Sequence, residues 1–501
     1  MPDTNQQYTT YTTTAQKAAD IYYASAVLGW DQETYMPPKG AEARARQLAT
    51  LASQAHELLT SDSYGRLLAD LNKTESLGDA EKNNVRLSSE DYGRNKKLSP
   101  EFVEELSKQT SESFNAWIAA RKQNDYSVFA PALAKMIALK RKQAELYGYK
   151  AHPYDALLDE YEKGATVAML DPLFTGIREQ LPTLLDKIKS APQVSNACFH
   201  RNFPKQQQWD FGIDVLTKMG FDFEAGRQDY SEHPFTTSFA PADVRITTRV
   251  SEDNFASMLW SCIHEGGHGL YEQGLPEEQY GLPLGAAASL GIHESQSRFW
   301  ENCIGRSLGF WQHFYPKVQQ YFPDQLADVT TTDFFKAANR VEPSLIRTEA
   351  DELTYHFHVM IRYEIEKALI EGSLDPKEIP VKWNELYQHY LGIRPTNDKT
   401  GALQDVHWSH GMFGYFPTYT LGSFYAAQFF HQVQKDVPGV QQQIESGEFT
   451  SILHWLREKV HRHGRRFTSE ELCAQITGKK LDTHEFFAYA QQKYALVYGI
   501  N

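Results

Sequence analysis

Cysteine is scarce in this sequence. The 501 residues include four cysteines, at positions 198, 262, 303 and 473, and no two of them are close enough to form a CxxC motif. This spacing argues against a zinc–thiolate cluster and against a disulfide framework, so we expect reduced thiols in the core. A chain of this length buries roughly three quarters of its unfolded surface, so its stability requires neither disulfides nor a structural metal.

Long apolar runs and an excess of positive charge are also missing. No charge-free run reaches the roughly 18 apolar residues that suggest a membrane span, and the polar N-terminus lacks the basic start and apolar run of a signal peptide. The sequence has 64 Asp and Glu against 50 Lys and Arg, a net charge of −14. This balance argues against a nucleic-acid or membrane partner. We expect an acidic cytoplasmic enzyme.

The apolar residues mostly recur at helical spacing. We expect helices over residues 13–30, 41–59, 63–73, 79–95, 99–124, 128–147, 166–190, 251–273, 284–310, 344–371 and 420–434. No repeat, low-complexity linker or shift in composition divides the chain. We therefore expect one mainly helical domain over residues 1–501, in which an N-terminal helical part, about 1–200, packs over a catalytic part, about 201–501.

One region has the character of β-strands. Between Phe221 and Val250, the stretches FTTSFA and VRITTRV are rich in Thr, Val, Ile and Phe, and Pro-Ala-Asp separates them. β-branched and aromatic residues on either side of a short polar break are typical of paired strands. We expect a small hairpin or meander here.

Two histidines four residues apart indicate a catalytic site. His264 and His268 lie one turn apart on the same face of a predicted amphipathic helix. Zinc binds neutral imidazole nitrogens at about 2.0–2.1 Å, and two ligands on one rigid helix lose little entropy on binding. Glu265 is rotated by about 100° from His264, so it points beside the ion, where a base that activates water belongs.

Such a histidine pair can also be ordinary helix surface, and the two glycines inside the motif argue against this. Gly266 and Gly267 each cost about 0.5–1 kcal/mol relative to alanine in a helix interior. We therefore expect another part of the chain to approach this helix closely, and we favour a metal site.

A catalytic zinc needs a third protein ligand and an open position. Glu294, on the predicted helix 284–310, is the best candidate. His293 is adjacent to Glu294 on this helix and faces about 100° away from it. Only one of the two can therefore bind the ion, and the other at most contacts one of the ligands. Glu301 ranks lower because the aromatic residues beside it indicate a packed turn. The expected reaction is amide hydrolysis, in which Glu265 takes a proton from water and delivers it to the leaving amine.

Several longer motifs accompany these residues. They are HPF at 233–235, DxRxT at 243–247, HExxH at 264–268, HESQ at 293–296, IRxxAD at 346–351 and GxxQDxHW at 401–408. In these motifs, and along nearly its full length, the sequence resembles the M32 family of metallocarboxypeptidases, the carboxypeptidase Taq group.

The resemblance implies both a site and an activity. It implies His264, His268 and Glu294 as ligands of one ion per chain, zinc or alternatively cobalt, with Glu265 as the catalytic base. It also implies a large helical zincin similar to neurolysin-like peptidases, with a small β-sheet near the active site, a long substrate groove, and a homodimer. The implied activity is the release of single amino acids from peptide C-termini with broad specificity.

An exopeptidase of this kind needs a fixed cation for the terminal carboxylate of its substrate. Arg347 and Arg362 lie on the predicted helix 344–371, where each could instead form a surface pair with the acidic residue four positions later. The spacing leaves this open, and the family motif favours Arg347. His358 resembles a further basic element near this subsite. We expect the two arginines to form a basic spot.

The segment from His407 to Gly422 interleaves glycine with aromatic and hydroxyl residues, as a loop over a substrate would. A tyrosine or histidine here could donate to the oxyanion that forms during hydrolysis. We favour Tyr419 and His407, with Tyr415 next; the alternative is aromatic core packing.

Two other functions remain open. An endo-oligopeptidase of related fold would use the same HExxH motif and downstream glutamate. A non-catalytic helical scaffold with a structural zinc is disfavoured, because such sites usually have four protein ligands, often thiolates.

Overall fold

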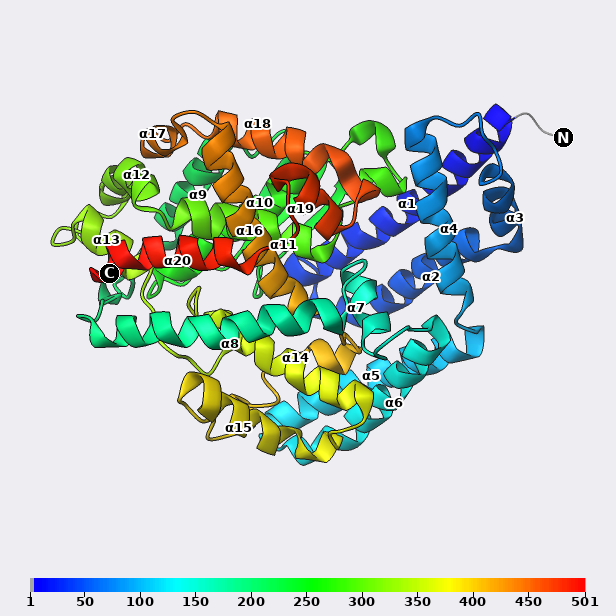
Figure 1. Cartoon of the computed structure of the whole chain (residues 1–501), viewed down its shortest axis with the longest axis horizontal. Coiled ribbons are helices and arrows are strands. Elements are labelled where there is room, and N and C mark those ends of the chain that lie inside the picture. Colours follow the sequence, from blue (N-terminus) through cyan, green and yellow to red (C-terminus); the bar gives the residue numbers. More distant parts are fainter. Residues whose placement is uncertain (1–3, 501) are drawn as a thin grey trace. The chain divides into compact units, whose positions relative to one another are not determined.

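Helices make up most of residues 4–500, the part of the chain that this computed structural model describes (Figure 1). The predicted mainly helical class is confirmed. The chain forms two compact units, each assembled from three segments: 1–96, 195–338 and 425–481 in the first unit, and 97–194, 339–424 and 482–501 in the second. The segment 1–200, which the sequence analysis groups as one part, is therefore divided between the two units.

The first unit contains the small sheet and many of the helices. Its helices are α1 (Thr4–Thr34), α2 (Ala41–Thr60), α3 (Asp62–Leu71), α4 (Asp79–Lys96), α9 (Lys205–Met219), α10 (Phe255–Glu272), α11 (Leu290–Arg298), α12 (Leu308–Tyr321), α13 (Thr331–Ala338), α17 (Val440–Glu445), α18 (Thr450–Lys459) and α19 (Ser469–Thr477).

The second unit contains α5 (Pro100–Gln123), α6 (Ala130–Tyr147), α7 (Asp155–Tyr161), α8 (Val167–Ser190), α14 (Tyr355–Glu371), α15 (Ile379–Leu391) and α20 (Thr483–Tyr498). Within it, α8 and α20 lie side by side (Figure 1). Helix α16 (Pro417–Asp436) contributes residues to both units.

The helix boundaries follow capping residues. The Ser99 hydroxyl accepts from the backbone N–H of Phe102 at the start of α5, and the Ser289 hydroxyl does the same for Ile292 at the start of α11. Gly220 ends α9 at a φ of 97°, in the left-handed region that glycine adopts without strain. These signals explain why most predicted helices agree with the structure to within a few residues.

The sheet has three strands, β1 (Gly226–Tyr230), β2 (Thr236–Ala240) and β3 (Asp243–Thr248), in the order β1-β3-β2. β2 and β3 form the predicted antiparallel hairpin, with Thr236 opposite Ile246. The alternative, a meander, does not form, because β1 pairs with β3 in parallel. The sequence of β1, GRQDY, is polar and carries no strand signal, so the sequence analysis missed it.

Two predicted helices are interrupted. The segment 284–310 contains α11, a π-helix (Phe299–Gly305) and the start of α12. In the segment 344–371, the α-helix begins only at Tyr355. Apolar spacing continues through these breaks, but local hydrogen bonds end the helices. The Asp351 carboxylate, for example, accepts from the backbone N–H groups of Leu353 and Thr354 and holds a turn before α14.

Aromatic packing fixes the start of α10. The Phe255 ring stacks on Phe203 at a centroid distance of 5.0 Å and meets Phe322 edge-on at 5.2 Å.

The four cysteines are buried, and none forms a disulfide, as expected. Within residues 4–500, no helix is both long and apolar enough to cross a membrane.

Candidate active site

Glycine allows α10 and α11, which lie side by side in Figure 1, to approach closely. A Cβ atom at Gly267 would lie 2.7 Å from the backbone oxygen of Gln296 and 2.7 Å from the Cα of Ser297, distances that real Cβ atoms do not reach. A Cβ at Gly266 would lie 2.4 Å from Leu216 Cδ2. The predicted close approach is confirmed, and at Gly267 it brings α11 next to the face of α10 that carries the histidines.

His264, His268 and Glu294 converge at this crossing. One ligand atom from each lies within 4.8 Å of the others. The Nε2 atoms of His264 and His268 lie 3.6 Å and 3.5 Å from Glu294 Oε2. Two ligands about 2.0–2.1 Å from one tetrahedral ion are separated by roughly 3.3–3.4 Å. The three side chains therefore fit one small divalent cation.

The Nδ1 atoms of both histidines are also engaged. His264 Nδ1 donates to Glu301 Oε2 at 2.8 Å, and His268 Nδ1 lies 2.7 Å from His293 Nδ1. Glu301 and His293 were the two alternatives to Glu294 as the third ligand. They instead contact the Nδ1 atoms of the imidazole rings, on the side away from the Nε2 atoms. Such outer partners orient metal-binding histidines and fix their tautomers.

The π-helix places Glu301 at the site. Arg298 Nη1 and Arg306 Nη2 donate to its carboxylate at 3.1 Å and 2.9 Å, and Arg298 Nε donates to Glu294 at 2.7 Å. Although burial opposes ionisation, these arginines and His264 hold the pKa of Glu301 well below its usual range. π-helical turns are rare and frequently occur at functional sites.

The Glu265 side chain reaches the start of β2 in the sheet. Its side chain is buried, and burial raises its pKa. The Thr236 hydroxyl, at the start of β2, donates to Glu265 Oε2 at 2.7 Å. The edge strand of the sheet therefore holds the expected base in one orientation.

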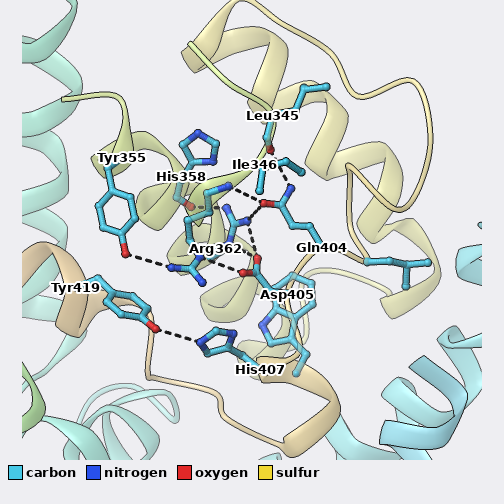
Figure 2. A network of polar contacts seen from close by, with 12 residues as sticks. Leu345, Ile346, Tyr355, His358, Arg362, Gln404, Asp405, His407 and Tyr419 are labelled. Atoms are coloured by element: carbon cyan, nitrogen blue, oxygen red, sulfur yellow. Dashed lines mark hydrogen bonds and ion pairs between the residues drawn. The ribbon is translucent and has the colours of Figure 1, made fainter. Parts of the chain in front are cut away.

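The second unit contains a buried ionic network (Figure 2). Arg347 Nε donates to Asp405 Oδ1 at 3.0 Å, and Arg362 Nε donates to Asp405 Oδ2 at 2.6 Å. Gln404 Oε1 accepts from Arg362 Nη2 at 2.8 Å and from the backbone N–H of Arg347 at 3.0 Å. Asp405 therefore neutralises one of the two positive charges of the predicted basic spot.

Two predicted substrate-binding residues are interior residues instead. Arg362 is fully buried, and each guanidinium nitrogen donates within the protein, with Nη1 bonded to the backbone oxygen of His358. His358 is also fully buried, and its Nδ1 lies 2.9 Å from the Tyr387 hydroxyl. Neither side chain is exposed for direct contact with a substrate in this structure. Neither arginine forms the alternative pair with the acidic residue four positions later.

Arg347 retains a free donor. It lies on a 3₁₀ turn (Arg347–Glu349), not on α14, and its Nη1 donates to the Tyr355 hydroxyl at 3.1 Å. Among the described residues, no hydrogen-bond partner meets its Nη2 atom, and its side chain is 7% exposed. One guanidinium edge is thus available, while Asp405 and Tyr355 fix the rest of the group.

His407 and Tyr419 point toward each other in Figure 2, with His407 Nε2 3.3 Å from the Tyr419 hydroxyl. Burial, together with Arg347, lowers the pKa of His407 to about 3, so this ring is neutral near pH 7. Tyr415 and Tyr419 are half-buried. Glu366 anchors this segment, because its carboxylate accepts from Trp408 Nε1 at 2.7 Å and from the backbone N–H of Gly414 at 2.8 Å.

A family model described as Carboxypeptidase Taq (M32) metallopeptidase matches residues 10–494. The chain belongs to the M32 metallopeptidase family. Thermostable carboxypeptidase 1 of Thermus thermophilus is 43% identical to it over 95% of this chain and 96% of that protein. Carboxypeptidase 1 of Bacillus subtilis is 40% identical over 95% of each chain. A crystal structure of the M32 carboxypeptidase from Deinococcus radiodurans R1 is 38% identical, with a TM-score of 0.97 over 99% of this chain and 100% of that one.

This M32 protein is a metal-dependent carboxypeptidase. The family model and the names of its curated relatives agree on that activity, and they favour it over the endo-oligopeptidase of related fold. The family model and these names also exclude the other alternative, a non-catalytic helical scaffold with a structural zinc.

Several residues of this M32 site were not assigned from the sequence. Asp405 and Gln404 lie inside the GxxQDxHW motif. The motif marks this segment, but it does not indicate what either residue does. Glu272 lies four residues after His268 on the same helix face, a spacing that could have found it. Thr236 follows the HPF motif directly, and Glu366 shows no pattern that separates it from a surface glutamate.

Replacing Thr236 by valine is expected to lower kcat of this M32 enzyme about ten- to a hundredfold. Valine keeps the shape of threonine but removes the hydroxyl, and a hydrogen bond to a charged group contributes about 1.5–3 kcal/mol. KM and the affinity for a divalent cation should not change, because among the described residues the Thr236 hydroxyl bonds only to Glu265. Steady-state kinetics on a short peptide measure both constants.

Serine at position 236 should restore kcat, because it restores the donor. Thr237→Val is the matched control on the neighbouring residue of β2. A Thr236→Val enzyme with the wild-type kcat would show that this hydrogen bond does not position the base.

Proposed function

We propose that His264, His268 and Glu294 hold one divalent cation in this carboxypeptidase, zinc or alternatively cobalt, and that Glu265 is its general base. The observation that supports this most directly is the convergence of the two Nε2 atoms on Glu294 Oε2. Burial and His293 lower the pKa of His268 to about 3, so its imidazole is neutral and able to bind a cation at pH 7.

Glu265 moves the proton during hydrolysis. A bound divalent cation supplies Lewis acidity, which polarises the scissile carbonyl and acidifies water. The Glu265 carboxylate accepts a proton from the attacking water, and it later donates this proton to the nitrogen of the leaving amine. Thr236 holds one carboxylate oxygen, so the other oxygen is left to exchange the proton.

Arg347 binds the terminal carboxylate of the peptide in this proposal. Its Nη2 atom donates to that carboxylate while Asp405 and Tyr355 prevent the guanidinium from turning away. Tyr419 and His407 donate to the substrate oxygen that gains charge, and Tyr415 lines the same segment. Recognition of the terminal carboxylate rather than of a side chain supports broad specificity for the residue released.

Peptides with free and amidated C-termini test this function. We expect amidation to lower kcat/KM roughly ten- to a hundredfold, because a charge-assisted hydrogen bond is lost. Mass spectrometry of the products should show single amino acids, which disappear with a chelator and return with zinc or cobalt. Internal fragments, or equal turnover of both peptides, would contradict the proposal.

We also propose that the enzyme acts as a cytoplasmic homodimer and that its two compact units form a single functional domain. The family resemblance supports the homodimer and the single domain, and the acidic net charge of −14 is in keeping with a cytoplasmic enzyme. Sedimentation of the purified protein at several concentrations would measure its oligomeric state.

A further inference from the structure

A chain of three side chains extends behind His268. Its Nδ1 atom lies 2.7 Å from His293 Nδ1, and His293 Nε2 donates to Glu272 Oε1 at 2.7 Å. His268 and Glu272 lie one turn apart on α10, and His293 reaches between them from α11. Their side chains are 14–20% exposed, so water competes little for these contacts.

The two facing Nδ1 atoms can share only one proton, so one ring donates and the other accepts. If a neutral His293 donated from Nδ1, its Nε2 atom would carry a lone pair 2.7 Å from the lone pairs of Glu272, an unfavourable contact. If His268 donates, the proton of His293 lies on Nε2 and meets the carboxylate. Glu272 therefore selects the second arrangement.

That arrangement has a consequence for His268. With its proton on Nδ1, the Nε2 atom of His268 presents a lone pair on the side of Glu294 Oε2. In the opposite arrangement Nε2 would carry the proton and could not bind a cation. His264 needs no such chain, because its Nδ1 donates directly to the Glu301 carboxylate.

We propose that Glu272, acting through His293, is a positioning residue that fixes the tautomer of His268 and so prepares the site for a cation. This inference rests on the proposed metal site. Glu272 contacts no ligand atom itself. Its effect should therefore appear in the affinity for metal and depend on the presence of His293.

Zinc titration of the metal-free protein tests the proposal. Glu272→Leu removes the acceptor and should raise the zinc dissociation constant about 10- to 100-fold, the usual effect of losing such an outer partner. Glu272→Gln keeps an acceptor oxygen and should stay within a few-fold of the wild type. Glu278→Leu removes an exposed carboxylate six residues later and should change nothing.

A second variant separates positioning from folding. His293→Leu should weaken zinc binding as much as Glu272→Leu, and the double variant should lose no more than His293→Leu alone, because the chain acts as one unit. The thermal unfolding temperature of each metal-free variant shows whether it folds. Additive losses would indicate two separate structural effects and overturn the proposal.

The outcomes also separate this inference from the proposed function. A wild-type protein that binds no zinc would contradict the metal site itself. Wild-type affinity retained in Glu272→Leu, or an equal loss in Glu272→Gln, would overturn the role of Glu272 while leaving the metal site in place.

Discussion

The Glu265→Gln enzyme should have a kcat about 10³–10⁴-fold below that of the wild type, the upper part of the range for general acid–base catalysis. Glutamine has the shape of glutamate but cannot accept the proton from water near neutral pH. The Thr236 hydroxyl can still donate to the amide oxygen, so the side chain should keep its orientation. KM should change little, because position 265 is not proposed to bind the peptide.

Metal binding provides the control for this variant. Glu265 is not one of the three converging residues, so zinc titration should give the wild-type dissociation constant. Steady-state kinetics of the zinc-loaded variant, with a peptide that has a free C-terminus, then measure the loss of kcat that is due to the missing base alone. A residual rate within tenfold of the wild type would show that another group takes the proton. A loss of zinc affinity would show that Glu265 belongs to the metal site.

The three proposed metal ligands are the part of the site that local sequence describes well. The spacing of His264 and His268 and the helix between them determine their relative position, and Gly267 signals the close crossing that brings in α11. Spacing alone does not separate Glu294 from His293 and Glu301. Both His293 and Glu301 do lie at the site, where each contacts the Nδ1 atom of one of the two histidines.

The arginines show where local spacing fails. The sequence suggested partners four residues away for Arg347 and Arg362, but both meet Asp405, which lies 58 and 43 residues further along the chain. A pair made across the fold leaves no periodic trace in either segment. The break before α14 was missed for a related reason, because the Asp351 turn depends on hydrogen bonds that helical spacing does not reveal.

Replacing Asp405 by asparagine is expected to destabilise the protein by about 3–5 kcal/mol, the usual cost of removing one partner from a buried ion pair. Asparagine keeps the size of the side chain but leaves Arg347 and Arg362 buried without a negative charge between them. Urea unfolding at pH 7 should show a lower midpoint, with no change in the slope. Asp398→Asn, a neutralised aspartate in the same unit, is a comparison that removes one charge outside this network.

The pH dependence of this loss of stability tests whether the charge of the Asp405 carboxylate is its cause. Although burial opposes ionisation, Arg362 and then Arg347 hold the pKa of Asp405 below its usual range. A folded-state pKa below the unfolded value, about 3.9 for aspartate, contributes stability above that pH and loses it as the pH falls toward the folded value. The difference in unfolding free energy between wild type and Asp405→Asn should therefore be full at pH 6–7 and shrink below about pH 4. A difference that stayed constant down to pH 3 would mean that packing, and not the Asp405 charge, explains the loss.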